Sequence, residues 1–304
     1  SPRNKHLFLG VDISSEMVFF AQNLIAMLNV LVKAGYKVED YEQRLAMLTR
    51  EKTQTASQIR ALMWDEKTGF FYDLDVNMQK IMIKTAAAFW TLISNVATKE
   101  QQDRLVWYLQ DPKTFNRLHR VPVLSADEAG YDSRGGYWRG SVWAPINTMV
   151  VLGLQACGYH SLAREIGRND VDAYSEVFEK TGTIWENYPP DELTQGDSDH
   201  PDFVGWSGIA PIFFFLSTVI GLQAHRSFST LYWDLPSDLL KKGSVGCKRY
   251  TFWGKRADFV ATLSDSNLVL QIHTNDSFSL KVSYDTRTFS YDITGDATLI
   301  EEVL

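Results

Sequence analysis

The chain has 304 residues, a hydrophobic fraction of 45% and a formal net charge of −7 at pH 7. This length is sufficient for a large core and suggests one large domain or two smaller ones. The negative charge argues against a nucleic-acid partner, which usually requires a basic face. The two cysteines, Cys157 and Cys247, provide neither a disulfide framework nor a cysteine-based metal site.

Up to about residue 225 the chain has the apolar periodicity of amphipathic helices. Asp12 and Ser141 stand at expected helix N-caps, and Thr98 with Gln101 is typical of a capping box. The helices are expected to span residues 12–34, 40–64, 85–96, 98–109, 141–156, 159–180 and 207–224.

A short hairpin and two long loops interrupt this helical pattern. The hairpin is expected to pair residues 70–74 with residues 80–83 around Asn77. The loops, residues 111–140 and 181–205, are polar, and loops of this length inside a compact domain are usually functional.

One apolar segment, residues 209–222, has to be weighed as a membrane span. It is too short to cross the hydrocarbon core, and Pro211 stands where a helix would start. We therefore expect a fully buried helix here and no membrane partner.

The character of the chain changes after residue 225, where apolar and polar residues begin to alternate as in β-strands. The helices before this point form pairs, with short links at one end and long loops at the other. The pattern predicts a mainly α protein, an (α/α)6 toroid over residues 1–225 that is incomplete in this chain. A small antiparallel, β-sandwich-like domain is expected over residues 226–304.

The glycine-rich segment 135–147 contains the densest group of functional side chains. Tyr137, Trp138 and Trp143 offer flat apolar faces with polar edges, and Arg139 offers a planar, charged donor. Aromatic faces stack on the C–H faces of sugar rings, so this segment indicates a carbohydrate site. An aromatic helix start that only fills a core remains the alternative.

Glu186 is the strongest catalytic candidate because Trp185 and Tyr188 flank it on a long loop. Partial desolvation between aromatic side chains raises a carboxyl pKa and suits acid–base chemistry near neutrality. A surface glutamate beside packed aromatic residues is the alternative. Other acids on the two loops either line the same site or solvate the loops: Asp127, Glu128, Asp132, Asp197, Asp199 and Asp202.

No metal or other cofactor is expected. The acidic run at Asp197 and Asp199 lacks the ligand spacing of a calcium loop. The histidines lack paired zinc spacing and are expected to be surface or capping residues, namely His119, His160, His200, His225 and His273.

Five blocks of sequence together resemble the glycoside hydrolase family 63 and trehalase group. They agree with this group in order and spacing and cover roughly residues 10 to 222. The blocks are residues 11–15 (VDISS), 62–73 (LMWDEKTGFFYD), 136–143 (GYWRGSVW), 185–188 (WENY) and 203–207 (FVGWS).

This resemblance implies an (α/α)6 barrel that hydrolyses α-glycosides, most simply α-glucosides, with inversion. Glu186 matches the general base of the family. The general acid is an aspartate that would fall just before Ser1, and the N-terminal half of the toroid is expected to be missing as well. The substrate, an oligosaccharide or small α-glycoside, would be bound by Tyr137, Trp138, Arg139, Trp143, Trp185, Tyr188 and Trp206.

Two other functions remain open from the sequence. The first is a non-catalytic carbohydrate-binding or scaffold protein that kept the aromatic site without the acid. The second is a toroid enzyme of different chemistry, such as a polysaccharide lyase, which no residue specifically requires.

Overall fold

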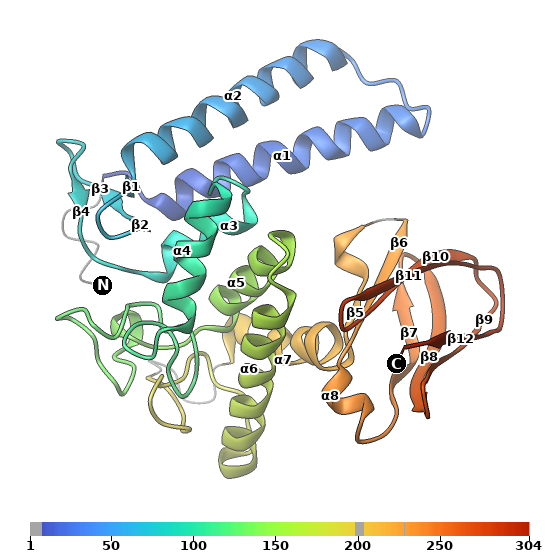
Figure 1. The fold of residues 1–304 in the computed structure, drawn as a ribbon. Helices are drawn as coiled ribbons and strands as arrows, with labels where there is room; N and C mark the ends of the chain where they lie inside the picture. The colour runs from blue at the N-terminus through green and yellow to red at the C-terminus, as the bar shows by residue number, and fades with distance from the viewer. Residues whose placement is uncertain (1–7, 198–203, 228, 304) are drawn as a thin grey trace. The chain divides into compact units, whose positions relative to one another are not determined.

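The computed structural model describes residues 8–197, 204–227 and 229–303 (Figure 1). The chain divides into two compact units, Ser1–Pro211 and Ile212–Leu304. The first unit is helical and the second is built of β-strands, so the predicted fold class is confirmed. The predicted boundary between functional domains at residue 225 stays a prediction.

The first unit begins with an antiparallel pair of long helices, α1 (Val11–Lys33) and α2 (Tyr41–Leu62) (Figure 1). Asp12 was predicted to be the N-cap of α1, but the helix begins one residue earlier, with Gly10 at the N-cap. The reason is a tertiary contact, because the buried Asp73 carboxylate accepts the Val11 N–H at 2.8 Å. Asp12 lies instead in the first turn, where its negative charge interacts favourably with the positive end of the helix dipole.

Helix α1 also meets the length and composition expected of a membrane span, alone among the described helices of the chain. From the sequence, only residues 209–222 were weighed as a membrane span. Core helices of globular proteins and signal sequences share the length and composition of α1.

Two very short hairpins follow α2. Strand β1 (Trp64–Asp65) pairs with β2 (Phe70–Phe71), and β3 (Asp73–Leu74) pairs with β4 (Lys80–Ile81). The predicted hairpin is therefore right only for β3 and β4. Phe70 and Phe71 pair with β1 because the Asp65 carboxylate accepts the Thr68 N–H at 2.9 Å and closes a tight turn.

Two of the other predicted helices are divided into shorter pieces. The segment 85–96 is a 3₁₀ turn at Ala86–Phe89 followed by α3 (Trp90–Ile93). The segment 207–224 comprises a 3₁₀ turn, α7 (Ala210–Phe214) and a π-helical turn that ends at Ile220. This segment is also not fully buried, since Ile209 is 77% and Ile212 64% exposed.

Three helices follow the prediction closely: α4 (Lys99–Gln110), α5 (Ala144–Ala156) and α6 (His160–Thr181). However, α5 begins three residues after the predicted N-cap, Ser141. Val142 is extended because its N–H and C=O both pair with the backbone of Tyr188, at 2.8 and 3.0 Å. The helix can therefore start only beyond it.

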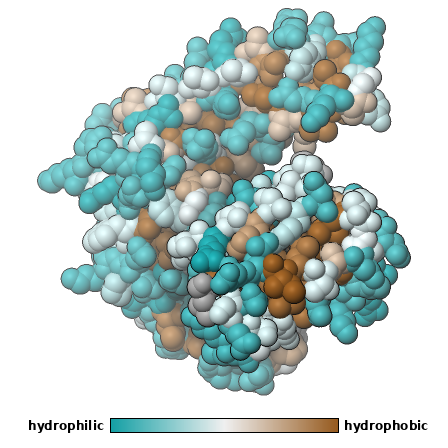
Figure 2. All heavy atoms as spheres, turned by 45° about the vertical axis from the view of Figure 1, so that its right-hand side comes forward, coloured by the Kyte–Doolittle hydropathy of each residue, from teal (hydrophilic) through white to brown (hydrophobic). Residues whose placement is uncertain are grey.

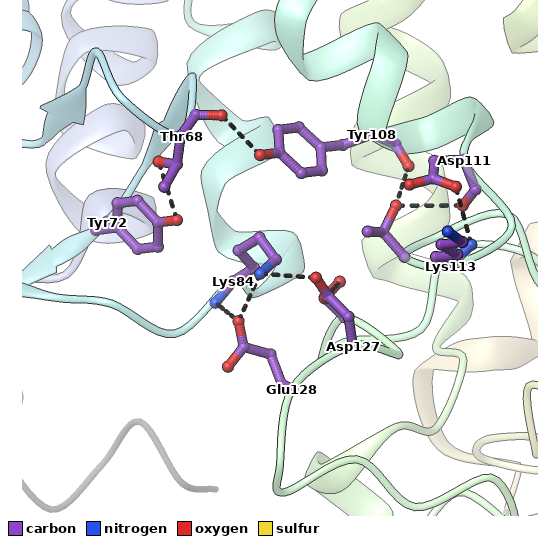
Figure 3. A network of polar contacts seen from close by, with 10 residues as sticks. Thr68, Tyr72, Lys84, Tyr108, Asp111, Lys113, Asp127 and Glu128 are labelled. Atoms are coloured by element: carbon purple, nitrogen blue, oxygen red, sulfur yellow. Dashed lines mark hydrogen bonds and ion pairs between the residues drawn. The ribbon is translucent and has the colours of Figure 1, made fainter.

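Lys84 anchors the loop 111–140 to the rest of the unit (Figure 3). Its ammonium group lies 3.0 Å from the carboxylates of both Asp127 and Glu128, and its backbone N–H donates to Glu128 at 2.9 Å. Burial alone would lower the pKa of Lys84, but the two carboxylates outweigh burial and raise it. Asp127 and Glu128 therefore have a structural role.

The second unit is a β-sandwich that also contains the end of α7, the π-helical turn that ends at Ile220 and a short helix, α8 (Ser237–Leu240). One sheet has the strand order β11-β10-β6-β5 and the other the order β12-β9-β8-β7. Pairing is antiparallel except between β10 and β6, which are parallel. The strands are β5 (Leu222–Gln223), β6 (Thr230–Leu235), β7 (Val245–Phe252), β8 (Lys255–Ser264), β9 (Asn267–Thr274), β10 (Phe278–Tyr284), β11 (Arg287–Ile293) and β12 (Ala297–Glu302).

The two sheets share one core, as the alternating sequence predicts. Trp233 of β6 and Phe259 of β8 are fully buried, and their ring centroids lie 5.4 Å apart. Along β6 every second residue is buried, which is the period expected of a strand with one face in a core.

The capping box at the start of α4 is confirmed and gives a first prediction. The Thr98 hydroxyl accepts the Gln101 N–H at 3.3 Å, and the Gln101 side chain accepts the Thr98 N–H at 3.0 Å. We expect Thr98→Ala to lower the free energy of unfolding by about 1 kcal/mol. Urea unfolding followed by circular dichroism measures this.

Thr53→Ala in the exposed middle of α2 is the matched control. The Thr53 hydroxyl caps no helix end and donates a hydrogen bond to the Thr49 carbonyl of its own helix. We expect its effect to lie within about 0.5 kcal/mol. Equal losses for the two variants would contradict the role of the cap.

Candidate active site

The segment that presents the predicted aromatic residues has an unusual backbone. Gly135, Gly136 and Tyr137 have successive positive φ angles of 104°, 53° and 59°. A left-handed conformation costs a non-glycine residue about 1–2 kcal/mol. Tyr137 is held in it because its carbonyl accepts the Ser141 N–H and because Asp132 and Arg139 close the loop through a backbone hydrogen bond of 2.9 Å.

This loop arranges the aromatic side chains around Trp143. Trp138 stacks on Trp143 with ring centroids 4.5 Å apart and an interplanar angle of 8°. Tyr137 and Trp206 meet Trp143 edge-on at 4.9 and 6.0 Å. Trp143 is 1% exposed and serves as the platform, whereas Trp206 is 56% exposed.

A pocket of about 370 Å³ lies beside this aromatic cluster, within the range typical of small-ligand sites. Trp138 and Trp206 form part of its wall, and their role in binding a sugar stays a prediction. Two carboxylates from the first turns of α1 add polar groups. The lining is Asp12, Glu16, Thr85, Ala86, Ala87, Trp90, Val123, Trp138, Pro145, Ile146 and Trp206.

Two further lining residues, Trp90 and Glu16, were not predicted from the sequence. Glu16 follows Asp12 by four residues, and this spacing places two side chains on the same face of a helix, so the signal was present. Burial, and secondly the charge of Asp12, raises the pKa of Glu16. No sequence pattern marked Trp90, because only the tertiary fold brings α3 to the pocket.

Backbone contacts on both sides of Glu186 fix its position. The Ser207 hydroxyl donates to the Glu186 carbonyl at 2.6 Å. Two residues further along, Tyr188 pairs with Val142, and the carbonyl of Pro190 accepts the His119 N–H at 2.9 Å. The loop that carries the candidate base is therefore rigidly connected to the loop that carries the aromatic residues.

The side chain of Glu186 faces the aromatic loop. The Tyr137 hydroxyl lies 3.5 Å from the Glu186 Oε1, at the outer limit of a hydrogen bond. Glu186 is partly exposed, so its carboxylate remains accessible to water. Tyr137 thus connects the carboxylate to the aromatic cluster through its contact with Trp143.

A buried polar cluster lies beneath this segment and corrects the prediction for His119. His119 was expected at the surface, but it is fully buried, and its Nε2 lies 2.6 Å from the Asp170 carboxylate. The Asn147 amide donates to both oxygens of that carboxylate, at 2.9 and 3.0 Å. Burial raises the pKa of Asp170, and the hydrogen bonds from His119 and Asn147 oppose the rise.

Tyr188 belongs to this cluster and does not lie at the surface. It is 1% exposed, and its ring packs against Tyr174 at 4.7 Å and His119 at 5.5 Å. Its hydroxyl accepts the Trp185 N–H at 2.9 Å, so it supports the residue before Glu186. Trp185 itself donates its indole N–H to the Thr181 hydroxyl at 2.9 Å.

The other candidates lie at the margins. Arg139 is mostly exposed, and its guanidinium pairs with Asp132 at 2.9 Å. Asp197 accepts a hydrogen bond from the Asn187 amide through its backbone carbonyl. Asp199, His200 and Asp202 lie outside the described residues. Within the described parts of the chain, no group of three or more metal-ligating side chains is close enough to hold a metal ion.

The stacked aromatic residues, the pocket with its two carboxylates and the loop that carries Glu186 all lie in the helical first unit, although Glu186 is not among the residues that line the pocket. The comparison with known families is specific. Residues 6–204 match the mannosylglycerate hydrolase MGH1-like glycoside hydrolase domain, and the chain belongs to this glycoside hydrolase family, as the resemblance predicted.

Individual relatives agree with this assignment. An uncharacterized protein of Borreliella burgdorferi is 28% identical over 76% of this chain and 49% of its own length. Mannosylglycerate hydrolase of Thermus thermophilus is 30% identical over 50% of this chain and 34% of its own. The crystal structure of the glycoside hydrolase family 63 mannosylglycerate hydrolase from T. thermophilus with glucose has a TM-score of 0.53 and 23% identity, covering 68% of this chain and 47% of that chain.

The chain thus spans about half the length, or less, of the relatives it matches. At 23% identity, the structural likeness shows a shared fold and nothing finer.

The buried cluster gives a second prediction. Removing the buried Asp170 carboxylate leaves the His119 ring and the Asn147 amide without a hydrogen-bond partner, and a buried polar group left unsatisfied costs about 1–3 kcal/mol. We expect Asp170→Ala to lower the free energy of unfolding by that amount, measured by urea denaturation followed by tryptophan fluorescence.

Glu176→Ala is the matched control, because Glu176 lies on the same helix and pairs with Lys180 at 2.7 Å, with both side chains about half exposed. An exposed pair contributes about 0–1 kcal/mol. If both variants lost the same stability, the cluster would have no special role.

Proposed function

We propose that this chain carries the sugar pocket and the general base of an inverting α-glycoside hydrolase. The observation that supports this most strongly is the placement of Glu186. Its backbone is held on both sides, while its carboxylate is accessible to water and faces the aromatic loop. A general base requires this combination of fixed position and contact with water.

In the proposed reaction a sugar ring lies against Trp138 and Trp206 in the pocket. Glu186 removes a proton from water, and this water attacks the anomeric carbon from the face opposite the leaving group. A carboxylic acid protonates the leaving oxygen, so that one C–O bond forms as the other breaks. By resemblance, this acid is an aspartate from outside the described residues.

The buried aromatic residues support these groups and do not touch the sugar themselves. Trp143 backs Trp138, and Tyr188 backs Trp185 and the Glu186 backbone. Arg139, paired with Asp132, contributes at the rim of the site. An α-glucoside or α-mannoside of small size is the substrate class that we infer from the family and from the size of the pocket.

The test of the base is Glu186→Gln in the protein as isolated from its natural host. The amide keeps the shape but cannot accept the proton from water, so we expect kcat to fall by about 10²–10⁴-fold. The variant Glu192→Gln, the same change at an exposed position of the same loop, should retain the activity. Near-normal turnover of Glu186→Gln would contradict the assignment. Inversion is tested separately by NMR, which identifies the anomer of the sugar product that forms first.

A carbohydrate-binding protein without catalysis is the second candidate, because the described residues contain the aromatic pocket but not the expected acid. Calorimetry with methyl α-glucoside and methyl α-mannoside separates the two functions. Binding of these sugars without any turnover by the protein from its natural host would favour the second candidate.

The pocket gives a further prediction for such binding. Trp206→Ala removes an exposed aromatic face from the wall, and we expect it to weaken sugar binding about tenfold, or about 1.4 kcal/mol. Trp107→Ala is the matched control, since Trp107 is 52% exposed on α4 and does not line the pocket. Equal affinities of the two variants would show that the sugar binds elsewhere.

A further inference from the structure

A surface pocket of the second unit, which we call the Trp253 pocket, lies at the turn between β7 and β8. Its volume is about 540 Å³, within the range of small-ligand sites. All of its walls come from the second unit, so it is separate from the pocket beside Trp143. The side chains that give it chemical character are Trp253, Lys255, Ser277, Ser279, Asp292 and Thr294.

Trp253 occupies a backbone position that does not suit a tryptophan. It is the first residue of the two-residue turn between Phe252 and Lys255, and its φ angle is 48°. A bulky residue with a positive φ is an outlier, and the conformation costs about 1–2 kcal/mol. Backbone strain of this kind occurs preferentially at functional positions.

Two other turns of the same unit show which residue such a position favours. The turns between β8 and β9 and between β10 and β11 also have two residues each. Their first residues are Asp265 and Asp285, with φ angles of 53° and 49°. Aspartate tolerates this conformation because its short polar side chain forms local hydrogen bonds. The geometry of the turn therefore does not account for the tryptophan.

The indole of Trp253 contacts both the core and the pocket. Its ring lies edge-on to the buried Phe252, with centroids 5.3 Å apart. The side chain nevertheless remains partly exposed and forms part of the pocket wall. Packing thus holds the ring in place, and its exposed part is available to a ligand.

Hydrogen-bonding groups surround this ring. Ser279 and Asp292 are cross-strand partners, and the Ser279 hydroxyl donates to the Asp292 Oδ1 at 2.8 Å. Asp292 is exposed, so its carboxylate can also accept hydrogen bonds from a ligand. Ser277 and Thr294 add exposed hydroxyl groups, and the Lys255 ammonium group donates to the Ser277 carbonyl.

This combination matches an uncharged sugar. An aromatic ring packs on the C–H face of a sugar, while hydroxyl and carboxylate groups bind the sugar hydroxyls. Lys255 and Asp292 carry opposite charges, so the lining has no net charge that would favour an ionic ligand. A lipid fits poorly, because the apolar lining residues Phe278 and Ile293 are only 7% and 3% exposed. Hydrophilic side chains also cover most of the molecular face in Figure 2.

We propose that the Trp253 pocket is a second carbohydrate site, which binds one ring of a neutral sugar against the indole of Trp253. Ser279 and Asp292 orient this ring through hydrogen bonds to its hydroxyl groups. The site adds a sugar contact to the second unit and takes no part in bond cleavage. It is independent of the role of Glu186 and stands even if the first unit has no activity.

Fluorine NMR of the whole protein labelled with 5-fluorotryptophan tests the proposal, because each tryptophan gives its own signal. Methyl α-glucoside, methyl α-mannoside and methyl β-galactoside are each added up to about 50 mM, which nearly saturates a site with a Kd of about 1–10 mM. We expect at least one of them to shift the Trp253 signal along a saturating curve. The exposed Trp107 lines neither pocket, and its signal should not move. An unresponsive Trp253, or an equal shift at Trp107, would overturn the proposal.

A substitution in the pocket wall provides a second measurement on the same signal. Asp292→Asn keeps the shape of the side chain but removes its charge, and hydrogen bonds to a carboxylate are stronger than those to a neutral amide. We expect the Kd read from Trp253 to rise about tenfold. Asp285→Asn is the same change at an exposed turn position outside the pocket and should leave the Kd unchanged. Equal values for the two variants would contradict the proposal.

Trp253→Asp assigns the signal and tests the alternative that Trp253 only covers the core. Its spectrum lacks the Trp253 signal. The substitution introduces the residue found at the corresponding positions of the other two turns and relieves the strain, so we expect a midpoint of urea unfolding no lower than that of the parent protein. A lower midpoint together with an unresponsive Trp253 signal would assign the tryptophan to packing alone.

Trp206→Ala separates the two sugar pockets. Trp206 lines the pocket of the first unit and not the Trp253 pocket. The Trp253 signal should therefore respond to the sugar with an unchanged Kd in this variant. A response that disappears in Trp206→Ala would indicate a single sugar site in the first unit and would overturn the proposal.

Discussion

Backbone pairing between four segments far apart in the sequence determines where the site residues lie. The carbonyl of Val123 accepts the Ala86 N–H at 3.0 Å, and the carbonyl of Ser141 accepts the Val123 N–H at 3.1 Å. The next residue, Val142, pairs in both directions with Tyr188. Each segment adjoins a residue of the pocket or the candidate base, so these hydrogen bonds align loops that helix packing alone would leave independent.

The same pairing explains why a loop of thirty residues is ordered. An isolated loop of this length would lose much conformational entropy on ordering. Here the entropy loss is offset by backbone hydrogen bonds, by the contacts of Lys84 with two carboxylates and by the buried cluster around Asp170. The strained backbone of Tyr137 persists because both ends of its segment are held.

The sequence predicted the helical and β-sheet character of the two units because periodicity reports which face of an element is buried. It also singled out the aromatic loop and Glu186, since both are short motifs with local meaning, and their roles in a site stay predictions. It misplaced the start of α5 because the pairing of Val142 with Tyr188 joins residues forty-six positions apart. His119 was assigned to the surface for a similar reason: only the fold brings Asp170 and Asn147 to it.

Helix α1 takes part both in the core of the first unit and in the pocket. Its first turns supply Asp12 and Glu16 to the pocket wall. Burial and a neighbouring charge raise the pKa of Glu16, and both depend on how the start of α1 is packed. The packing of α1 against the rest of the first unit through Val11, Val18 and Ala21 therefore also determines where its two pocket carboxylates lie. The packing of the helix and the geometry of the pocket are consequently one physical problem, because a single helix takes part in both.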